Sequence, residues 1–426
     1  MNTLLSNKML RVGIIGCGDI SNLNVLGYLH SQDTELVAVS DTDIKRAGEK
    51  LERWGLRTLK IYTDYKRMID HEDLDIVEIL IPHHLHAETT IYAAKHNIKG
   101  ISVQKPLAHT ILDCEKMIQV CKQKNVKLKL YENFRFYPIY LKAKELLNDG
   151  IIGDLLNFRI NTIEVGGPSM SVDVKSYNWR TNIGTCGGFP WIYDDGIHKF
   201  SMALWLMDQE RVEKVYSWID FFNGTQDYPS YVFWKYPIKN SDDPPKYGAM
   251  GITIASNLYY PNNYYKCDEF IEISGSKGMM WINQCTCGGN FVSKTPQYPP
   301  IVVYVNGEVK TYGNELPRDW RYSFINSTEH FINVVKNGGT PIYTGEQGKN
   351  LCIFAKMPYI SQQQKRSVFW EEITSENEQD RSCIVETPEE LDPSKLHKYY
   401  SRKRKDMRKG IKEGLIHKEF KYQYED

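Results

Sequence analysis

Three short segments of the chain concentrate side chains that can move protons or bind charged groups. They are Pro82-His83-His84-Leu85-His86, Gln104-Lys105-Pro106 and Asp194-Asp195-Gly196-Ile197-His198. A histidine titrates near neutral pH, so His198 is a candidate general base for an alcohol that loses hydride. Lys105 precedes a proline, which favours an extended backbone and can hold the ammonium where an alkoxide charge develops. These residue types indicate oxidation of an alcohol or reduction of a ketone.

Asp194 and His198 are four residues apart and share one face if the segment is helical. The carboxylate can then orient the imidazole or join it on one substrate, although a surface helix pair has the same spacing. The adjacent histidines of the first segment point in opposite directions on an extended chain, and no carboxylate cluster lies near them. We therefore expect no metal site.

A glycine-rich turn follows the first apolar run. Leu10 to Ile15 reads as a buried strand, and Gly16-x-Gly18-x-x-Ser21 then leads into a helical pattern. Glycines at these positions permit a tight turn and a close approach to a pyrophosphate, while Ser21 is small enough for helix and sheet to pack. The free N–H groups of the helix start favour phosphate, so the turn predicts a dinucleotide site.

Asp41 ends the second strand, about 20 residues after the glycines. A carboxylate there accepts the ribose hydroxyls and repels a 2′-phosphate, which favours NAD. Lys45 and Arg46 follow closely and either contact a 2′-phosphate or are solvated helix charges, so NADP is also possible.

The elements that carry these motifs alternate in the first third of the chain. β-Branched runs at 10–15, 36–40, 76–81, 101–103 and 126–130 are separated by helical patterns at 20–29, 44–54, 87–96 and 114–124. This order predicts an α/β fold with a parallel, doubly wound, Rossmann-type sheet.

Strand patterns dominate from about residue 155. They cover 155–164, 212–219, 231–236, 250–258, 270–274, 279–282 and 301–305, with helical patterns at 321–336 and 346–363. We expect a C-terminal α/β domain with an open, mostly antiparallel sheet. The predicted division is 1–133 for the NAD(P)-binding domain, 134–370 for the substrate and oligomerisation domain, and 371–426 for a charged C-terminal extension.

Composition excludes several classes. The 53 Lys and Arg residues balance 53 Asp and Glu residues, so nothing attracts the chain as a whole to nucleic acid or an anionic membrane. No run approaches the ~18 apolar residues of a membrane helix, and the first apolar run reads as structure rather than a signal peptide. Nine scattered cysteines, with Cys285 and Cys287 as the only close pair, favour reduced thiols and a cytoplasmic protein. The basic run after residue 401 follows an acidic block, which favours a solvated extension, or an arm over a neighbouring subunit, over a nucleic-acid patch.

The motifs together resemble the glucose-fructose oxidoreductase, inositol 2-dehydrogenase and rhizopine-catabolism (Gfo/Idh/MocA) family. The resemblance covers roughly residues 10–370 and rests on Gly16-Cys17-Gly18-Asp19-Ile20, Asp41, Pro82 to His86, Lys105-Pro106, Trp179-Arg180, Gly187-Gly188 and Asp194-x-Gly196-x-His198. It implies an NAD(P)-dependent hydride transfer at a secondary hydroxyl or ketone of a sugar, sugar derivative or cyclitol. It also implies a homodimer or homotetramer that contacts through the open sheet.

The resemblance assigns roles residue by residue. His198 is the proton acceptor, and Lys105 and Asp194 bind the reacting hydroxyl. The expected cofactor contacts are Gly16, Gly18, Asp19, Ile20, Asp41, Pro82, His86, Gln104 and Lys105. The expected substrate contacts are Lys105, Tyr131, Asn133, Arg135, Tyr177, Trp179, Arg180, Asp194, Asp195 and His198, with Asn178 beside them.

Two positions depart from the family pattern. Gln104 stands where the family usually has glutamate, and Ser201 stands where the helix often has aspartate three residues after the histidine. Both changes remove negative charge near Lys105 or His198 and, with the charged extension, favour a function without catalysis. The resemblance itself also includes relatives with another chemistry, so two other functions remain open. One is glycoside cleavage or elimination through transient oxidation by a retained NAD, and the other is a dinucleotide-binding regulator without catalysis.

Overall fold

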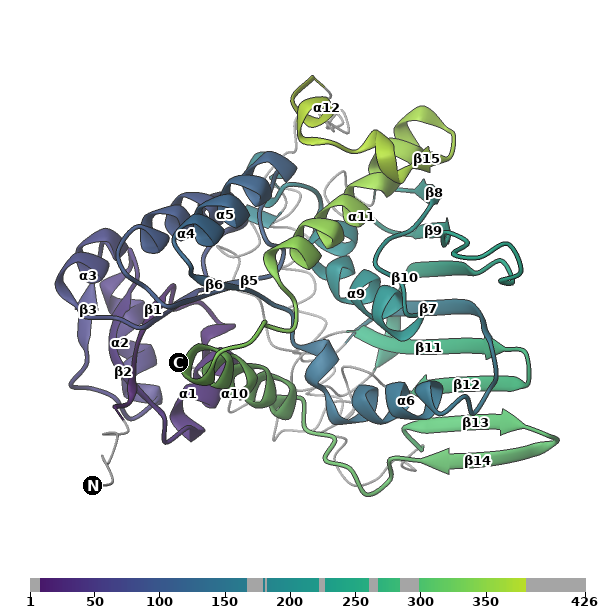
Figure 1. Ribbon diagram of the computed structural model, residues 1–426, viewed down its shortest axis with the longest axis horizontal. Helices are drawn as coiled ribbons and strands as arrows, with labels where there is room; N and C mark the ends of the chain where they lie inside the picture. Colours follow the sequence, from purple (N-terminus) through teal and green to yellow (C-terminus); the bar gives the residue numbers. More distant parts are fainter. Residues whose placement is uncertain are drawn as a thin grey trace.

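The structure is a computed structural model that describes residues 8–166, 179–180, 182–221, 227–259, 267–283 and 299–380. Its strands form two sheets that lie side by side (Figure 1). The N-terminal sheet, purple to blue at the left of the view, is separated from the C-terminal sheet at the right by helices that follow the first sheet in the chain, among them α9 (Gly196–Leu206), α10 (Arg321–Asn337) and α11 (Gly345–Gln364). The fold is α/β, as the sequence predicts.

The first sheet has six parallel strands in the order β3-β2-β1-β4-β5-β6. Its strands are β1 (Leu10–Ile15), β2 (Thr34–Ser40), β3 (Lys60–Tyr62), β4 (Ile76–Ile79), β5 (Gly100–Gln104) and β6 (Lys127–Tyr131). The connecting helices are α1 (Ser21–His30), α2 (Ile44–Arg53), α3 (Tyr65–His71), α4 (His86–Ala94) and α5 (Ile111–Gln123). This is the doubly wound order in which ligands bind at the carboxyl ends of the strands.

The second sheet has nine strands in the order β14-β13-β12-β11-β7-β10-β9-β8-β15. Its strands are β7 (Leu155–Gly166), β8 (Lys214–Ile219), β9 (Ser230–Lys235), β10 (Tyr247–Tyr259), β11 (Cys267–Gly275), β12 (Gly278–Asn283), β13 (Ile301–Val305), β14 (Glu308–Tyr312) and β15 (Val368–Phe369). Neighbours are antiparallel except for β10 and β7, which run parallel.

The helices that follow the first sheet in the chain are α6 (Pro138–Asn148), α8 (Ile183–Cys186), α9 (Gly196–Leu206), α10 (Arg321–Asn337), α11 (Gly345–Gln364) and α12 (Ser375–Asp380). One-turn segments are η1 (His83–Leu85), η2 (Phe134–Phe136), the π-helical η3 (Pro190–Asp195) and η4 (Trp370–Glu372). Helix α9 is buried on nearly all sides, because Phe200 stacks on Phe354 of α11 and meets Trp234 of β9.

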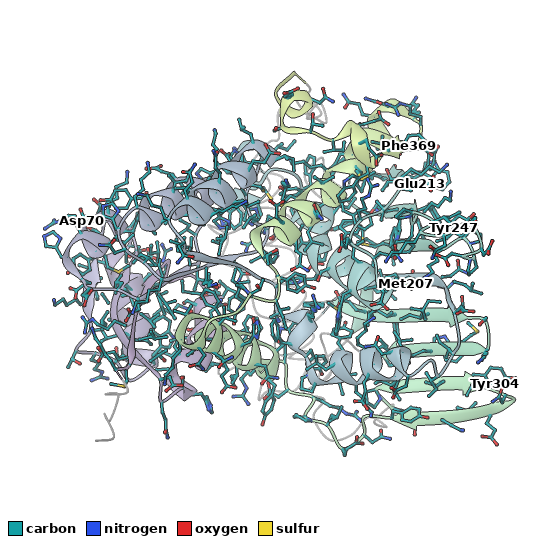
Figure 2. The ribbon with its side chains drawn as sticks, in the orientation of Figure 1. Asp70, Met207, Glu213, Tyr247, Tyr304 and Phe369 are labelled. Atoms are coloured by element: carbon teal, nitrogen blue, oxygen red, sulfur yellow. The ribbon has the colours of Figure 1, made fainter. Side chains whose placement is uncertain are left out.

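The two faces of the second sheet differ in chemistry. Residues such as Val232, Met250 and Ile271 alternate along the strands and are buried beneath the helices. The opposite face carries exposed aromatic side chains, two of which, Tyr247 and Tyr304, are labelled on the right of the molecule in Figure 2. Strand alternation therefore produces one helix-covered face and one open face.

Helix α10 lies beside α1 of the N-terminal domain (Figure 1). The contact is close because α1 has Gly27 at the crossing, where an added Cβ would lie 2.3 Å from Thr328 Cβ. The Lys129 ammonium of β6 donates to the carbonyl and hydroxyl oxygens of Ser327 at 2.7 Å. The second half of the chain thus covers part of the first sheet.

Candidate active site

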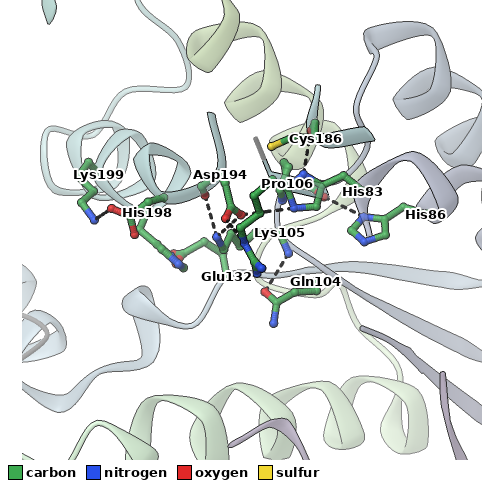
Figure 3. A network of polar contacts seen from close by, with 12 residues as sticks. His83, His86, Gln104, Lys105, Pro106, Glu132, Cys186, Asp194, His198 and Lys199 are labelled. Carbon is green, nitrogen blue, oxygen red and sulfur yellow. Dashed lines mark hydrogen bonds and ion pairs between the residues drawn. The ribbon is translucent and has the colours of Figure 1, made fainter. Parts of the chain in front are cut away.

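The site is built where three adjacent parallel strands end. β4 leads into η1 with His83, β5 leads into Lys105, and β6 leads into Glu132. From the second domain, η3 and the start of α9 bring Asp194 and His198 to the same place (Figure 3). All five side chains are buried or nearly so.

The Asp194 carboxylate is surrounded by cationic or N–H donor groups. Lys105 Nζ donates to Asp194 Oδ1 and to its backbone oxygen, both at 2.7 Å. Arg180 Nε donates to Oδ2 at 2.8 Å, and His83 Nε2 lies 3.3 Å from Oδ1. Burial alone would raise the pKa of Asp194, but Lys105 and Arg180 hold it well below the usual range. Asp194 is therefore an anion that fixes the Lys105 ammonium.

His198 is oriented by a residue of the first domain. Its Nδ1 lies 2.5 Å from Glu132 Oε1, and its ring stacks on Phe134 with centroids 4.1 Å apart. Burial lowers the pKa of His198, and the hydrogen bond to Glu132 opposes that shift. The imidazole is therefore neutral at pH 7 and can accept a proton at Nε2.

Glu132 is itself fully buried and held in place. Its Oε1 accepts from the backbone N–H of Phe134 at 3.1 Å, and its Oε2 accepts from the Ser201 hydroxyl at 2.8 Å. The Ser201 hydroxyl also contacts the Tyr343 hydroxyl. Ser201 stands where the family often has aspartate. In this chain the carboxylate beside His198 is that of Glu132, which follows β6 in the first domain rather than lying on α9.

This geometry corrects the predicted role of Asp194 in orienting His198. The two residues do not pair across one helical face. Asp194 belongs to the π-helical turn η3, and its carboxylate faces Lys105 instead of His198. Asp194 and His198 remain close enough to act on one substrate, which was the other interpretation of their spacing (Figure 3).

Asp195 belongs to a buried ion cluster of the second domain. Its carboxylate contacts the buried Lys199 ammonium, which in turn contacts Glu269 of β11. This ion cluster ties α9 to the second sheet, and a substrate contact of Asp195 stays a prediction.

The polar residues around the end of β6 have separate environments. The Tyr131 hydroxyl is fully buried and donates to the Phe324 carbonyl at 3.0 Å, which corrects its prediction as a substrate contact. Asn133 is buried and donates to the Ser323 hydroxyl at 2.8 Å. Arg135 is half-buried, with its guanidinium 5.2 Å from the Trp205 ring centroid, and stays a candidate substrate contact.

His86 braces the loops beside the site rather than reaching Asp194. Its Nε2 lies 2.8 Å from the Ile81 carbonyl and its Nδ1 lies 3.0 Å from the Pro106 carbonyl, and burial lowers its pKa to about 3. It links the segment around Pro82 to the cis Lys105–Pro106 peptide. Gln104 accepts the Lys105 N–H through its own Oε1 at 2.9 Å.

The glycine turn fits the phosphates of a dinucleotide. Gly16 has φ +99°, and an added Cβ would meet the Leu80 carbonyl at 2.3 Å, so a side chain is excluded there by the protein itself. A Cβ at Gly18 would meet no atom within 4 Å, so that glycine leaves open space next to the start of α1. The N-cap of α1, Ile20, supplies no side-chain cap, and Asp19 is neutralised by Lys50 at 3.3 Å. This open, uncapped helix start is suited to an anion.

Asp41 lies at the end of β2, as predicted, and its side chain is almost fully buried. Arg46 forms an ion pair with it at 2.6 Å. Lys45 points elsewhere and lies 3.8 Å from Glu49. Of the two basic residues near Asp41, only Arg46 therefore contacts the carboxylate.

Some predicted features lie outside the described residues. They include Tyr177, Asn178, the Cys285 and Cys287 pair, and the basic part of the extension. Trp179 is described, and its ring lies 4.5 Å from His83 and 4.3 Å from the Arg180 guanidinium carbon. Among the described residues, no helix is long and apolar enough to cross a membrane, and no metal-binding group of side chains is present.

The fold and site define a class of protein: a two-domain, dinucleotide-dependent oxidoreductase with its reactive groups between a Rossmann domain and an open-sheet domain. Family models agree with this class, since residues 10–132 match an oxidoreductase family with an NAD-binding Rossmann fold and residues 140–281 match the GFO/IDH/MocA C-terminal domain. The chain belongs to the Gfo/Idh/MocA family, and its cofactor is NAD.

Curated relatives extend over most of the chain. Myo-inositol 2-dehydrogenase of Thermotoga maritima is 27% identical over 373 residues, which cover 85% of this chain and 99% of the relative. D-apiose dehydrogenase of Paraburkholderia graminis is 22% identical over 386 residues, covering 86% and 91%. A solved levoglucosan dehydrogenase in complex with NADH and levoglucosan shares the fold, with TM-score 0.68 and 20% identity over 85% of this chain and 99% of that chain.

Sequence reasoning missed two functional residues. His83 lies in a segment already singled out, but only the structure shows that it, rather than His86, contacts Asp194. Glu132 lies between the two predicted contacts Tyr131 and Asn133. Its signal is a carboxylate directly after a predicted buried strand, which requires a partner when it is buried.

Proposed function

We propose that the protein transfers hydride between NAD and a secondary hydroxyl or ketone of a sugar, sugar derivative or cyclitol. The observation that carries this proposal is the convergence of Lys105, Asp194 and a neutral, carboxylate-bound His198 at the carboxyl end of the Rossmann sheet. The names of the two curated relatives, dehydrogenases of a cyclitol and a sugar, support the substrate class.

Lys105 binds the reacting oxygen in this proposal. Its ammonium is held by two oxygens of Asp194, which leaves its third proton for a substrate oxygen. Such a fixed positive charge stabilises the alkoxide that develops as the hydroxyl proton leaves. When bound, NAD would supply the hydride acceptor for the carbon that carries this oxygen.

His198 takes the hydroxyl proton at Nε2. Glu132 fixes the tautomer with the proton on Nδ1 and stabilises the imidazolium that forms. Phe134 keeps the ring plane in position. In the reducing direction the same imidazolium returns its proton to the ketone oxygen.

Trp179, Arg180 and Arg135 supply the wall for a polyhydroxylated ligand. Trp179 offers a ring face with the Arg180 guanidinium beside it, and the Arg135 guanidinium, which lies over Trp205, offers further hydrogen-bond donors. Asp194 holds Arg180, so the wall and the reacting centre are linked by one carboxylate.

Absorbance at 340 nm tests the reaction. Purified protein is supplied with NAD and a panel of inositols, aldoses, nucleotide sugars and glycosides, while a denatured sample is assayed for released dinucleotide. A rise with one polyol class is expected. Cleavage of a glycoside without any rise in absorbance would overturn this proposal and indicate transient oxidation by a retained NAD. Reversible NAD binding without any product would instead indicate a dinucleotide-binding regulator.

We also propose that two copies of the chain pair through the open face of the second sheet. Cross-strand register places Trp218 opposite Tyr231, and Tyr304 opposite both Met279 and Val309, on this exposed face. Arg159 and Glu272 lie on the same face and form an ion pair. Exposed rings with charges of both signs suit a self-complementary, two-fold contact.

Sedimentation of wild type and Trp218→Glu tests the pairing. The variant adds a charge to an exposed ring position, so the monomer is expected to keep its fold and lose the partner. A monomeric wild type would overturn the pairing without affecting the proposed chemistry. We propose that the enzyme acts in the cytoplasm, because its nine cysteines are scattered along the sequence, as is typical of proteins that keep reduced thiols.

A further inference from the structure

The carboxylate that should bind the adenosine ribose is already saturated by protein donors. Asp41 Oδ1 accepts from Arg46 Nη2 at 2.6 Å and from the Asp43 N–H at 2.8 Å. Asp41 Oδ2 accepts from the Cys17 N–H at 2.8 Å and from Arg46 Nε at 3.2 Å. A carboxylate has about four acceptor positions, so none is left for a further donor.

The four donors differ in how easily they can leave. Cys17 belongs to the glycine turn and Asp43 caps α2, so both N–H groups are fixed by the backbone of the fold. Arg46 lies in the first turn of α2, and its side chain is 37% exposed. A pair of ribose hydroxyls can therefore reach Asp41 only by taking the two positions that Arg46 occupies.

We infer that Arg46 is a specificity-determining residue that competes with the ribose of NAD for Asp41 and binds the 2′-phosphate of NADP. Against NAD, the guanidinium acts as an internal competitor and weakens binding. Toward NADP, it neutralises the carboxylate that would repel the phosphate and presents planar donors that match phosphate oxygens. The pair lets one site accept both dinucleotides.

The inference concerns the cofactor site alone and does not depend on the proposed reaction. Lys45 gives a matched comparison, because it precedes Arg46 on the same helix, is 86% exposed and contacts Glu49 instead of Asp41. Removing its charge changes the formal charge of the helix by the same amount but leaves Asp41 saturated.

Calorimetric titration with NAD and with NADP, without any substrate, tests the inference on wild type, Arg46→Gln and Lys45→Gln. In Arg46→Gln we expect NAD to bind several-fold tighter, because the ribose hydroxyls no longer have to displace Arg46 from Asp41. We expect NADP to bind about tenfold more weakly, because its 2′-phosphate loses the charged hydrogen bond to the guanidinium. In Lys45→Gln the ratio of the two dissociation constants should stay within about twofold of wild type.

An unchanged ratio in Arg46→Gln, or weaker binding of both dinucleotides, would overturn the inference. Arg46→Lys is the second variant, because it keeps the positive charge but cannot fill both carboxylate oxygens. It should keep NADP affinity near wild type while tightening NAD. If NAD binds no more tightly to either variant than to wild type, Arg46 does not compete with the ribose for Asp41.

Discussion

His198 Nδ1 and Glu132 Oε1 lie 2.5 Å apart although the two residues are 66 positions apart in the chain. Glu132 follows the last strand of the Rossmann sheet, whereas His198 lies on a helix of the second domain. The proposed base is therefore oriented by a residue of the other domain. Its tautomer depends on the two domains keeping their relative position.

Glu132→Gln should lower kcat by about 10²-fold, because the base becomes weaker and the imidazolium loses its anion. Burial lowers the pKa of His198 and Glu132 opposes that shift, so removing the charge lowers the pKa further. The acid limb of kcat/KM against pH should move to lower pH. Glu88→Gln, a surface glutamate paired with Lys66, is the matched control. An acid limb at the wild-type pH would contradict the role of Glu132.

His198→Asn should lower kcat/KM by about 10³-fold, since a positioned general base contributes about 10²–10⁴. NAD affinity, measured by fluorescence titration, should be unchanged because His198 contacts Glu132 and Phe134 rather than the glycine turn or Asp41. His96→Asn changes an exposed histidine next to Tyr92 and serves as the control. Full activity in His198→Asn would exclude it as the proton acceptor.

The two glycines of the turn should separate stability from cofactor binding. Gly16→Ala places a Cβ against the Leu80 carbonyl at positive φ, so we expect a loss of about 1–3 kcal/mol in the free energy of unfolding. Gly18→Val meets no protein atom at the Cβ, so stability should change by less than about 0.5 kcal/mol while NAD affinity falls more than tenfold. Normal NAD binding in Gly18→Val would place the phosphates elsewhere.

Asp227 should make stability depend on pH near the site. It accepts the Trp191 and Ile192 N–H groups and so holds η3, and burial raises its pKa to about 6. Since the folded pKa lies above the unfolded value, its contribution is complete at low pH and is lost as pH rises through about 6.

Urea unfolding at two pH values measures this contribution. Between about pH 5 and 7.5 wild type should lose about 1 kcal/mol relative to Asp227→Asn. Asp220→Asn, at an exposed carboxylate, should follow wild type. Parallel pH dependence in wild type and Asp227→Asn would show that Asp227 does not titrate in this range.

The sequence predicts the Rossmann half well because its strands are buried on both faces and read as apolar runs between helical patterns. Short or polar strands and one helix are not predicted from these patterns. β3 has three residues at the sheet edge, and β14 is exposed along most of its length, so neither shows a buried pattern. Helix α6 begins at Pro138, directly after η2, and carries a buried stripe that the sequence analysis did not use.

The site divides in a similar way. Lys105, Asp194 and His198 are recognisable because their motifs have fixed spacing, but spacing does not determine which way a side chain points after a strand ends. The turn η2 directs Glu132 into the site, while Tyr131 remains in the core against Phe324. The π-helical turn η3 likewise separates Asp194 from Asp195, which no helical or extended periodicity predicts.

The packing of α10 on α1 also determines the order in which the protein can be completed on the ribosome. Roughly 190 residues separate the end of β6 from α10, which takes about 10–40 s to synthesise at ordinary elongation rates. During that time Gly27, Gly100 and Lys129 lack the helix that covers them. A nascent N-terminal half therefore emerges with an apolar surface that only the late part of the same polypeptide can cover, and a truncated gene product would keep that surface exposed.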